Sequence, residues 1–139
     1  MKRTLKFLLL FLIVTSCTTV NEEYFKKVKG EWQITQFYHG EDDLMLESYR
    51  IIGFERSTRL WMTKREGRKT KFISSKYKFS KKLDTLQIDI KDSEDARLNG
   101  NYNVYIDTTN WTKESYMIHL TLDSENTYIE AIRPRFKDQ

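Results

Sequence analysis

Few side chains in this sequence have the type and the spacing that chemistry requires. The one thiol belongs to Cys17, so a disulfide within the chain is impossible and any reaction of this thiol joins it to another molecule. The two histidines are His39, at the start of the acidic stretch "HGEDD", and His119, between two apolar residues. Protein zinc sites use three or four ligands. We therefore expect no metal centre here, and we interpret the His39 stretch as a solvated loop unless another loop completes a site.

Motifs that position a catalytic nucleophile or a phosphate are also missing. The sequence contains neither a Gly-x-Ser-x-Gly elbow nor a glycine-rich phosphate loop. We therefore expect a protein that is not an enzyme and that needs no cofactor. The strongest local charge is the basic stretch "TKREGRKTKF" (Thr63–Phe72). We favour a hairpin tip kept soluble by its charges over a site for phosphate headgroups or acidic glycans.

The residues around Cys17 indicate what its thiol does. A basic start, "MKRTLK", precedes the apolar run "FLLLFLIV" (Phe7–Val14). A membrane-spanning helix needs about 20 apolar residues, so this run has instead the length of a signal-peptide core. The stretch that follows, "VTSC" (Val14–Cys17), resembles the bacterial lipobox, with Val where Leu is commonest. The resemblance implies cleavage after Ser16 and a lipid thioether on Cys17. The alternatives are a plain secretory signal and a cytosolic chain with an apolar first helix.

A lipid-modified Cys17 would place the protein in the cell envelope of a bacterium. Two or three acyl chains hold a protein on a bilayer, since each buried methylene contributes roughly 0.8 kcal/mol. Thr18 stands where the enterobacterial sorting rule reads an Asp as retention in the inner membrane, so the resemblance implies the outer membrane, at its periplasmic face or the cell surface. Without the basic leader the chain has 21 basic and 20 acidic side chains. This balance gives no reason to expect nucleic-acid binding.

The remaining sequence predicts strands. Residues 20–29 favour a short helix, with Asn21 as its cap and Gly30 as its end. Beyond Gly30, apolar residues recur at every second position, which is the period of a strand with one buried face. The alternation predicts eight strands, over residues 30–38, 48–55, 58–64, 69–80, 85–91, 101–107, 115–122 and 127–133. Gly53, inside the second of these, is expected to mark a bulge.

The order of these segments predicts one β-barrel. The chain of 139 residues is long enough for a single domain, and its aromatic share of 14% suits a β-rich core. Segments 1–16, 17–29 and 30–139 are interpreted as the signal peptide, the lipidated tether with its helix, and the barrel domain. Short connections favour antiparallel neighbours, and closure removes the two open edges. We therefore predict an all-β, eight-stranded, antiparallel up-and-down barrel with a short N-terminal helix.

The start of the first strand resembles a lipocalin. Gly30 and Trp32 form a Gly-x-Trp motif after a short helix, and Arg133 stands at the end of the last predicted strand. In lipocalins such a Trp closes one end of the barrel, and such an Arg packs over its ring. The resemblance thus implies a small lipocalin-like domain of a bacterial lipoprotein. The segment "DTTNW" departs from the lipocalin motif expected there, and Trp32 as a core aromatic of another small barrel or sandwich remains an alternative.

Two functions follow from a tethered barrel. The first is binding of a small apolar or amphipathic ligand inside it, where hydroxyl groups would orient the ligand. The tyrosines expected to face the interior, and so to line such a cavity, are Tyr38, Tyr77, Tyr102 and Tyr116. The second is an accessory or inhibitor role, in which the barrel is filled and docks an envelope protein. The sequence favours the first narrowly.

Overall fold

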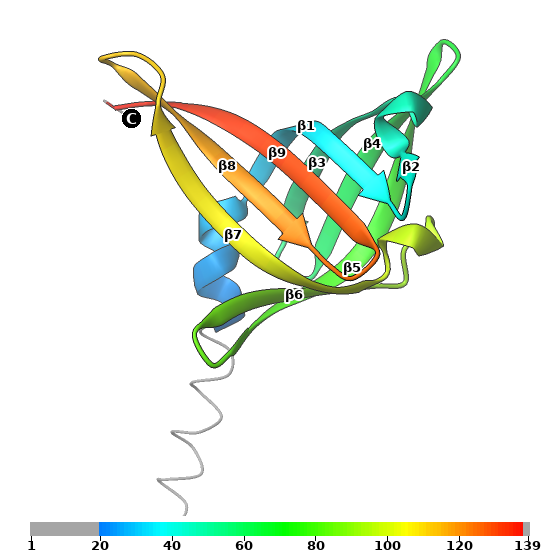
Figure 1. Cartoon of the computed structure of the whole chain (residues 1–139), viewed down its shortest axis with the longest axis horizontal. Helices are drawn as coiled ribbons and strands as arrows, with labels where there is room; N and C mark the ends of the chain where they lie inside the picture. Colours follow the sequence, from blue (N-terminus) through cyan, green and yellow to red (C-terminus); the bar gives the residue numbers. More distant parts are fainter. Residues whose placement is uncertain (1–19, 138–139) are drawn as a thin grey trace, which may run out of the picture.

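The structure, a computed structural model, describes residues 20–137 and shows a closed barrel of eight antiparallel strands (Figure 1). One additional two-residue strand and a short helix, over residues 20–28, complete the regular elements together with two 3-10 turns. The elements after the helix are β1 (Gly30–His39), β2 (Asp42–Asp43), η1 (Leu44–Glu47), β3 (Tyr49–Arg56), β4 (Arg59–Glu66), β5 (Lys69–Lys82), β6 (Thr85–Lys91), η2 (Ala96–Leu98), β7 (Gly100–Asn110), β8 (Ser115–Asp123) and β9 (Thr127–Phe136). The predicted fold class is confirmed.

The barrel closes through β1. From β3 to β9, each strand pairs with its neighbour in the sequence, as a meander. The first strand divides its pairing, because residues 30–33 pair with β3 and residues 33–39 pair with β9. Gln33 stands opposite a residue of each partner. The two edge strands of the meander are thereby joined, which satisfies the backbone groups that an open sheet would expose.

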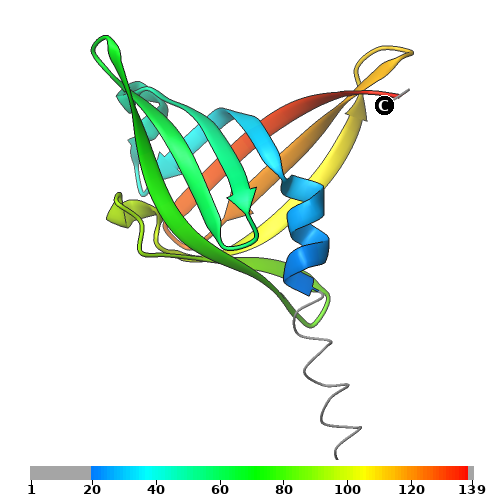
Figure 2. The ribbon, with the colours of Figure 1, turned by 180° about the vertical axis from the view of Figure 1, so that it is seen from behind.

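The two ends of the barrel carry different structures (Figures 1 and 2). At one end, called the helix end here, lie the helix over residues 20–28 and the turns at residues 57–58, 83–84 and 111–114. At the other, called the distal end, lie η1, η2 and the turns at residues 67–68 and 124–126. Both views place the β4–β5 hairpin tip and the helix at opposite ends of the molecule.

Two predicted details of the strands are wrong. The pairing register shifts between Ile34 and Gln36, so the alternation inverts after this bulge. Phe37 is fully buried as a result, whereas Tyr38, expected to face inward, points outward and is 39% exposed. Gly53, expected to mark a bulge, is paired in register with residues of β1 and β4. Its place is explained below by the side chain that covers it.

Inward-facing side chains fill the barrel. A cavity wide enough for a ligand would leave accessible area on the side chains that line it, but the core residues are at most 5% exposed. The largest of the fully buried side chains come from six strands and from η1: Trp32, Phe37, Leu44, Tyr49, Ile52, Phe54, Leu60, Met62, Phe79, Ile88, Ile90 and Tyr102. Leu98 of η2 is fully buried as well. The described interior is therefore a packed hydrophobic core.

The helix over residues 20–28 covers the helix end of this core. Val28 is fully buried, and Tyr24 and Phe25 pack against the core residues. Asn21, predicted as the cap, lies within the helix and joins it to the β3–β4 turn and to β5. Its amide donates to the Ser57 carbonyl (2.7 Å) and its oxygen accepts from the Phe79 amide (2.8 Å). Within residues 20–137, the helical segments are all too short or too polar to cross a bilayer.

Candidate functional site

The structure brings Gly30, Trp32 and Arg133 together at the helix end. The guanidinium of Arg133 lies 4.0 Å from the ring centroid of Trp32, within the range of a cation–π contact. The indole nitrogen of Trp32 donates to the Val28 carbonyl (2.7 Å). Gly30 has a φ of +103°, and a β-carbon there would lie 3.4 Å from the Arg133 Nη1. A glycine at this position therefore permits both the left-handed backbone and the close approach of the guanidinium.

Arg133 also caps the helix. Its Nη1 donates to the Lys29 carbonyl (2.6 Å) and its Nη2 to the Lys27 carbonyl (3.0 Å). These are carbonyls at the C-terminal end of the helix, where a positive charge is favourable. Burial lowers the pKa of Arg133 to about 10, so the side chain stays charged at neutral pH. One residue of the last strand thus ties the helix to the barrel, and its role here is structural.

Charged side chains close the distal end. Arg97 donates two hydrogen bonds to the Glu47 carboxylate, at 2.7 and 3.0 Å, and two to the Asp95 carboxylate, at 2.7 and 3.0 Å. Lys64 donates to Glu47 (2.7 Å) and the Tyr49 hydroxyl donates to Asp95 (2.5 Å). The Arg97 hydrogen bond lowers the pKa of Glu47 to about 2 and also holds the pKa of Asp95 well below its usual range. This cluster binds η1 to η2 across the mouth of the barrel.

The tyrosines expected to line a ligand cavity are placed differently from one another. Tyr77 and Tyr102 face inward, but both hydroxyls donate to backbone carbonyls, those of Arg56 and Leu98 respectively, at 2.7 Å each. Burial raises the pKa of Tyr102 to about 12. Tyr116 is half-buried near the helix end, opposite Arg135, and Tyr38 points outward. These four side chains do not converge on one space, and two of their hydroxyls already have partners.

An apolar band instead crosses the outer face of the barrel. Ile132, Gln33, Ile51, Thr63 and Phe72 stand opposite one another on five successive strands, and cross-strand partners share a face of the sheet. Phe72 is 60% exposed. Trp61 and Pro134 occupy the next row. The outer apolar band is defined here as Ile51, Trp61, Phe72, Ile132 and Pro134.

Trp61 explains the glycine beneath it. Its indole ring lies on Gly53, where a β-carbon would come within 2.3 Å of two ring atoms. The Phe72 ring meets the Trp61 ring edge-on, with 5.5 Å between centroids. A β-carbon at position 53 would push the indole off the sheet. Gly53 therefore serves the outer surface rather than a bulge.

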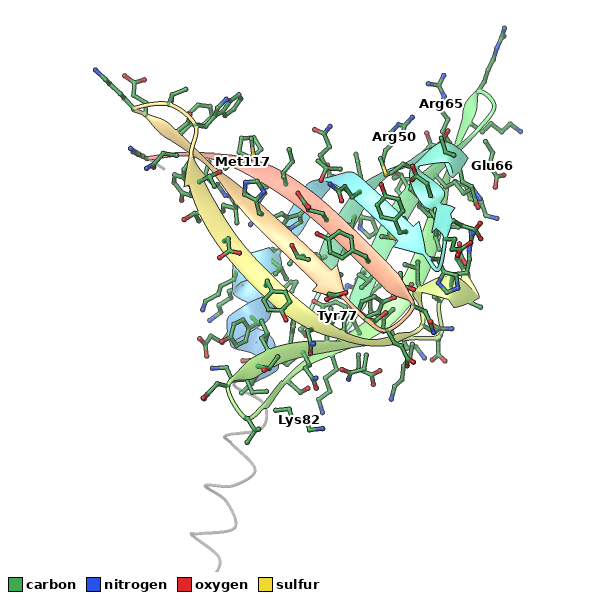
Figure 3. The ribbon with its side chains drawn as sticks, viewed as in Figure 1. Arg50, Arg65, Glu66, Tyr77, Lys82 and Met117 are labelled. Carbon is green, nitrogen blue, oxygen red and sulfur yellow. The ribbon has the colours of Figure 1, made fainter. Side chains whose placement is uncertain are left out.

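A hollow of about 380 Å³ lies at one side of the band. Ile51, Ile132 and Pro134 give it apolar walls, with Glu31 and Arg50 among its polar lining residues. Two further arginines, Arg59 and Arg65, project from the same face of β4 as Trp61. Figure 3 shows Arg50 and Arg65 pointing away from the barrel. Within residues 20–137, none of the salt bridges involves Arg50, Arg59 or Arg65.

The remaining residues considered in the sequence, His39, His119 and Cys17, are not part of the outer apolar band. His39 hydrogen-bonds the Thr127 hydroxyl (2.8 Å), and His119, which faces outward, hydrogen-bonds the Thr109 hydroxyl (2.9 Å). Within the part of the chain that the structure describes, three or more His, Cys, Asp or Glu side chains are nowhere grouped to hold a metal ion. Cys17, the predicted lipidation site, lies outside the described residues.

Sequence reasoning missed the outer apolar band, although a signal for it exists. Ile51, Trp61, Phe72 and Ile132 each break the alternation by placing an apolar residue at an outward position. Comparison with models of known families, with curated proteins and with solved structures gives no match. The function must therefore be inferred from the chain's own residues.

Proposed function

We propose that this protein is a lipid-anchored envelope protein that docks another protein through the outer face of a filled barrel. Cys17, in the lipobox-like stretch, carries the lipid, and the membrane of the cell envelope, the outer one where two exist, holds the protein. The outer apolar band is the docking surface. The partner brings an apolar side chain into the hollow beside Ile51 and Ile132, and acidic groups toward Arg50, Arg59 and Arg65.

The observation that carries this proposal is the contrast between the two faces of the sheet. The inward face is packed to near zero exposure, whereas the outward face exposes an aromatic pair and an apolar hollow. Exposed apolar patches on soluble domains mark interaction sites. Aromatic and arginine side chains are also the residues enriched at protein interfaces and their hot spots. The composition of the band is thus that of an interface.

Site-specific photo-crosslinking in intact cells tests the docking surface. A benzophenone amino acid replaces Phe72 or Ile132, and Tyr105, an exposed aromatic residue of β7 outside the band, serves as the matched control position. We expect one discrete crosslinked species from positions 72 and 132 and none from position 105. We also expect Arg50→Glu to reduce its yield at least tenfold. Equal labelling at all three positions would show that the band has no specific partner.

Metabolic labelling with palmitate tests the anchor separately. We expect incorporation into the wild-type protein and its loss in Cys17→Ser, since the thioether needs the thiol. Incorporation that persists in the variant would place the lipid elsewhere, and none in either protein would favour a plain secretory signal.

Ligand binding inside the barrel, the other function that the sequence leaves open, remains a prediction with less support. The hydroxyls of Tyr77 and Tyr102 are hydrogen-bonded to backbone carbonyls, and the distal end is closed by the Glu47–Arg97–Asp95 cluster. Native mass spectrometry of the gently purified protein decides this point. A stoichiometric small molecule of defined mass would support ligand binding inside the barrel, and the mass of the protein alone would argue against such binding.

A further inference from the structure

The turn between β5 and β6 has an unusual residue at its tip. Leu83 is 94% exposed, the highest exposure among the large hydrophobic side chains of residues 20–137. Its φ is +56°, in the left-handed region that two-residue hairpin loops require and that Gly, Asn and Asp adopt most readily. Packing does not demand a leucine there, and the local backbone disfavours one. Natural proteins break such local rules mainly at functional or strained sites, so the position of Leu83 calls for a functional role to be tested.

This turn lies beside the first turn of the N-terminal helix. The ammonium of Lys81 is 5.4 Å from the ring centroid of Tyr24, and the rings of Tyr24 and Phe79 are 6.1 Å apart. The Asn21 side chain accepts from the Phe79 amide, as described above. Figures 1 and 2 both show the start of the helix and the β5–β6 turn side by side, and Figure 3 shows Lys82 at that tip. The start of the helix and the β5–β6 turn therefore pack against each other.

Sequence distance places the proposed anchor close to this turn. Cys17 precedes residue 20, where the helix begins, by three residues. Three residues reach at most about 10 Å in any conformation. Acyl chains on Cys17 would thus keep the helix start, and the β5–β6 turn with it, close to the bilayer surface. This step rests on the proposed lipid anchor.

We propose that the β5–β6 turn is a second membrane contact, in which Leu83 enters the headgroup region of the bilayer that holds the anchor. Lys81 and Lys82 precede Leu83 and can place their ammonium groups at the level of the lipid phosphates. Asp84, Glu22 and Glu23 oppose such an attraction, although Glu23 is paired with Lys27 (3.5 Å). The apolar tip, rather than net charge, therefore defines the contact.

This contact gives the barrel one orientation. An anchor alone permits rotation about a short tether, whereas an anchor and an inserted side chain fix two points of the helix end on the surface. The distal end and its basic β4–β5 hairpin then project away from the lipid (Figure 1).

A fluorescent probe at position 83 tests the contact in the full-length lipidated protein. A thioether at Cys17 leaves the thiol of Leu83→Cys as the one that an environment-sensitive dye can label. Leu46→Cys is the matched control, because Leu46 is 84% exposed in η1 at the distal end. Both proteins are placed in vesicles of phosphatidylethanolamine and phosphatidylglycerol. We expect a blue shift at position 83, with quenching by spin-labelled headgroups, and neither effect at position 46.

Each possible outcome separates the anchor from the turn. Vesicle flotation reports the anchor, so loss of flotation, or labelling of the wild-type Cys17, would refute the lipid anchor and the contact that depends on it. Flotation with a water-like spectrum at position 83 would refute the membrane contact alone. A probe at position 83 that is shielded in native envelope membranes but not in pure lipid vesicles would show that a protein covers Leu83 and would also refute it.

Discussion

At the scale of single residues, Arg133 of β9 contacts both β1 and the C-terminal end of the helix. Its guanidinium stacks on Trp32 from β1, and two of its nitrogens donate hydrogen bonds to carbonyls at the end of the helix. The contacts are close and partly withdrawn from water, where hydrogen bonds from a charged donor contribute more than neutral ones. The stack and the caps depend on one another, since the same planar group makes both.

We expect Arg133→Ala to lower the free energy of unfolding by about 2–3 kcal/mol, the sum of a desolvated cation–π contact and two charge-assisted hydrogen bonds. Urea denaturation followed by tryptophan fluorescence measures the change. Arg135→Ala, an exposed arginine two residues further along the same strand, should stay within about 0.5 kcal/mol of wild type. Equal losses in both variants would mean that the stack adds nothing.

The contact between Trp32 and Arg133 could be predicted from the resemblance of Gly30 and Trp32 to the lipocalin motif, which implies an Arg packed over the Trp ring. Gly30 and Trp32 stand at the start of the first strand and Arg133 at the end of the last, and closure brings those ends together. The orientation of Tyr38 could not be predicted in the same way. A bulge at Thr35 and Gln36 leaves no mark in the alternation of residue types, yet it inverts every side chain that follows on β1.

At the scale of elements, the β5–β6 turn combines local strain with an apolar tip. A left-handed conformation at a residue with a β-carbon is unfavourable by roughly 1–2 kcal/mol, and Asn tolerates it better than Leu. We expect Leu83→Asn to raise the free energy of unfolding by about 0.5–1 kcal/mol while weakening the membrane contact. Thermal unfolding in detergent measures the first effect. Leu46→Asn should not raise the free energy of unfolding. An increase in both variants would point to a general effect on solubility instead of relief of strain at position 83.

The two 3-10 turns of the distal end form a second element-scale device, held by the Glu47–Arg97–Asp95 cluster. Both carboxyl groups have folded-state pKa values below their usual values, so the stability they contribute is present above about pH 4.5 and is lost as the pH falls toward about 2. We expect wild-type unfolding temperatures to drop through this range. Arg97→Ala should be less stable at neutral pH by about 1–2 kcal/mol, because the cluster is partly solvated, and should show a weaker acid dependence.

Lys76→Ala is the control for this acid dependence. Lys76 pairs with Asp92 at 3.0 Å, but both side chains are largely exposed. Such a pair contributes little, so this variant should keep the wild-type pH profile. If the two variants lose the same stability with the same profile, the cluster does not hold the distal end closed.

Strands could be predicted from alternation, but the closing elements of the distal end could not. The predicted barrel strands have counterparts in the structure, with boundaries shifted by a few residues, because half-buried strands repeat with period two. In contrast, β2 lies in the stretch His39–Asp43, which is interpreted from the sequence as a polar loop, and no element is predicted where η1 follows it. The turn η2 lies in "DSEDARLNG" (Asp92–Gly100), which also has the composition of a loop. Arg97 and Glu47 are 50 residues apart in the sequence, so their pairing leaves no local pattern.

At the scale of the whole molecule, the packed interior favours binding at the outer surface of the barrel over binding inside it. Side chains of η1 and η2 complete the core together with those of the strands. A ligand could therefore enter the barrel only if the core rearranged, whereas the outer apolar band is accessible without any rearrangement. The fold was predictable as a closed barrel, but whether it was hollow was not. That property depends on how inward side chains interdigitate, and residue type at each strand position does not determine it.

We expect Phe72→Ser to abolish crosslinking from position 132 while changing the free energy of unfolding by less than about 0.5 kcal/mol, because Phe72 is mostly exposed. Crosslink yield in cells and urea denaturation measure the two quantities. Tyr105→Ser, the same change outside the band, should leave both unaltered. Loss of crosslinking in the two variants alike would indicate reduced protein in the envelope rather than a lost interface.

The division of β1 between β3 and β9 has a consequence for biosynthesis. A chain synthesised from its N-terminus contains the helix, Trp32 and seven strands of the barrel before β9 is made. Until β9 pairs, β1 and β8 each have an unpaired edge, and the carbonyls of Lys27 and Lys29 lack their hydrogen bonds from Arg133. Contacts between the first and last strands are the most distant in sequence, so their formation is slow. Folding of this protein therefore passes through a nearly complete intermediate with open strand edges, which is prone to pair with other chains until the final strand closes the barrel.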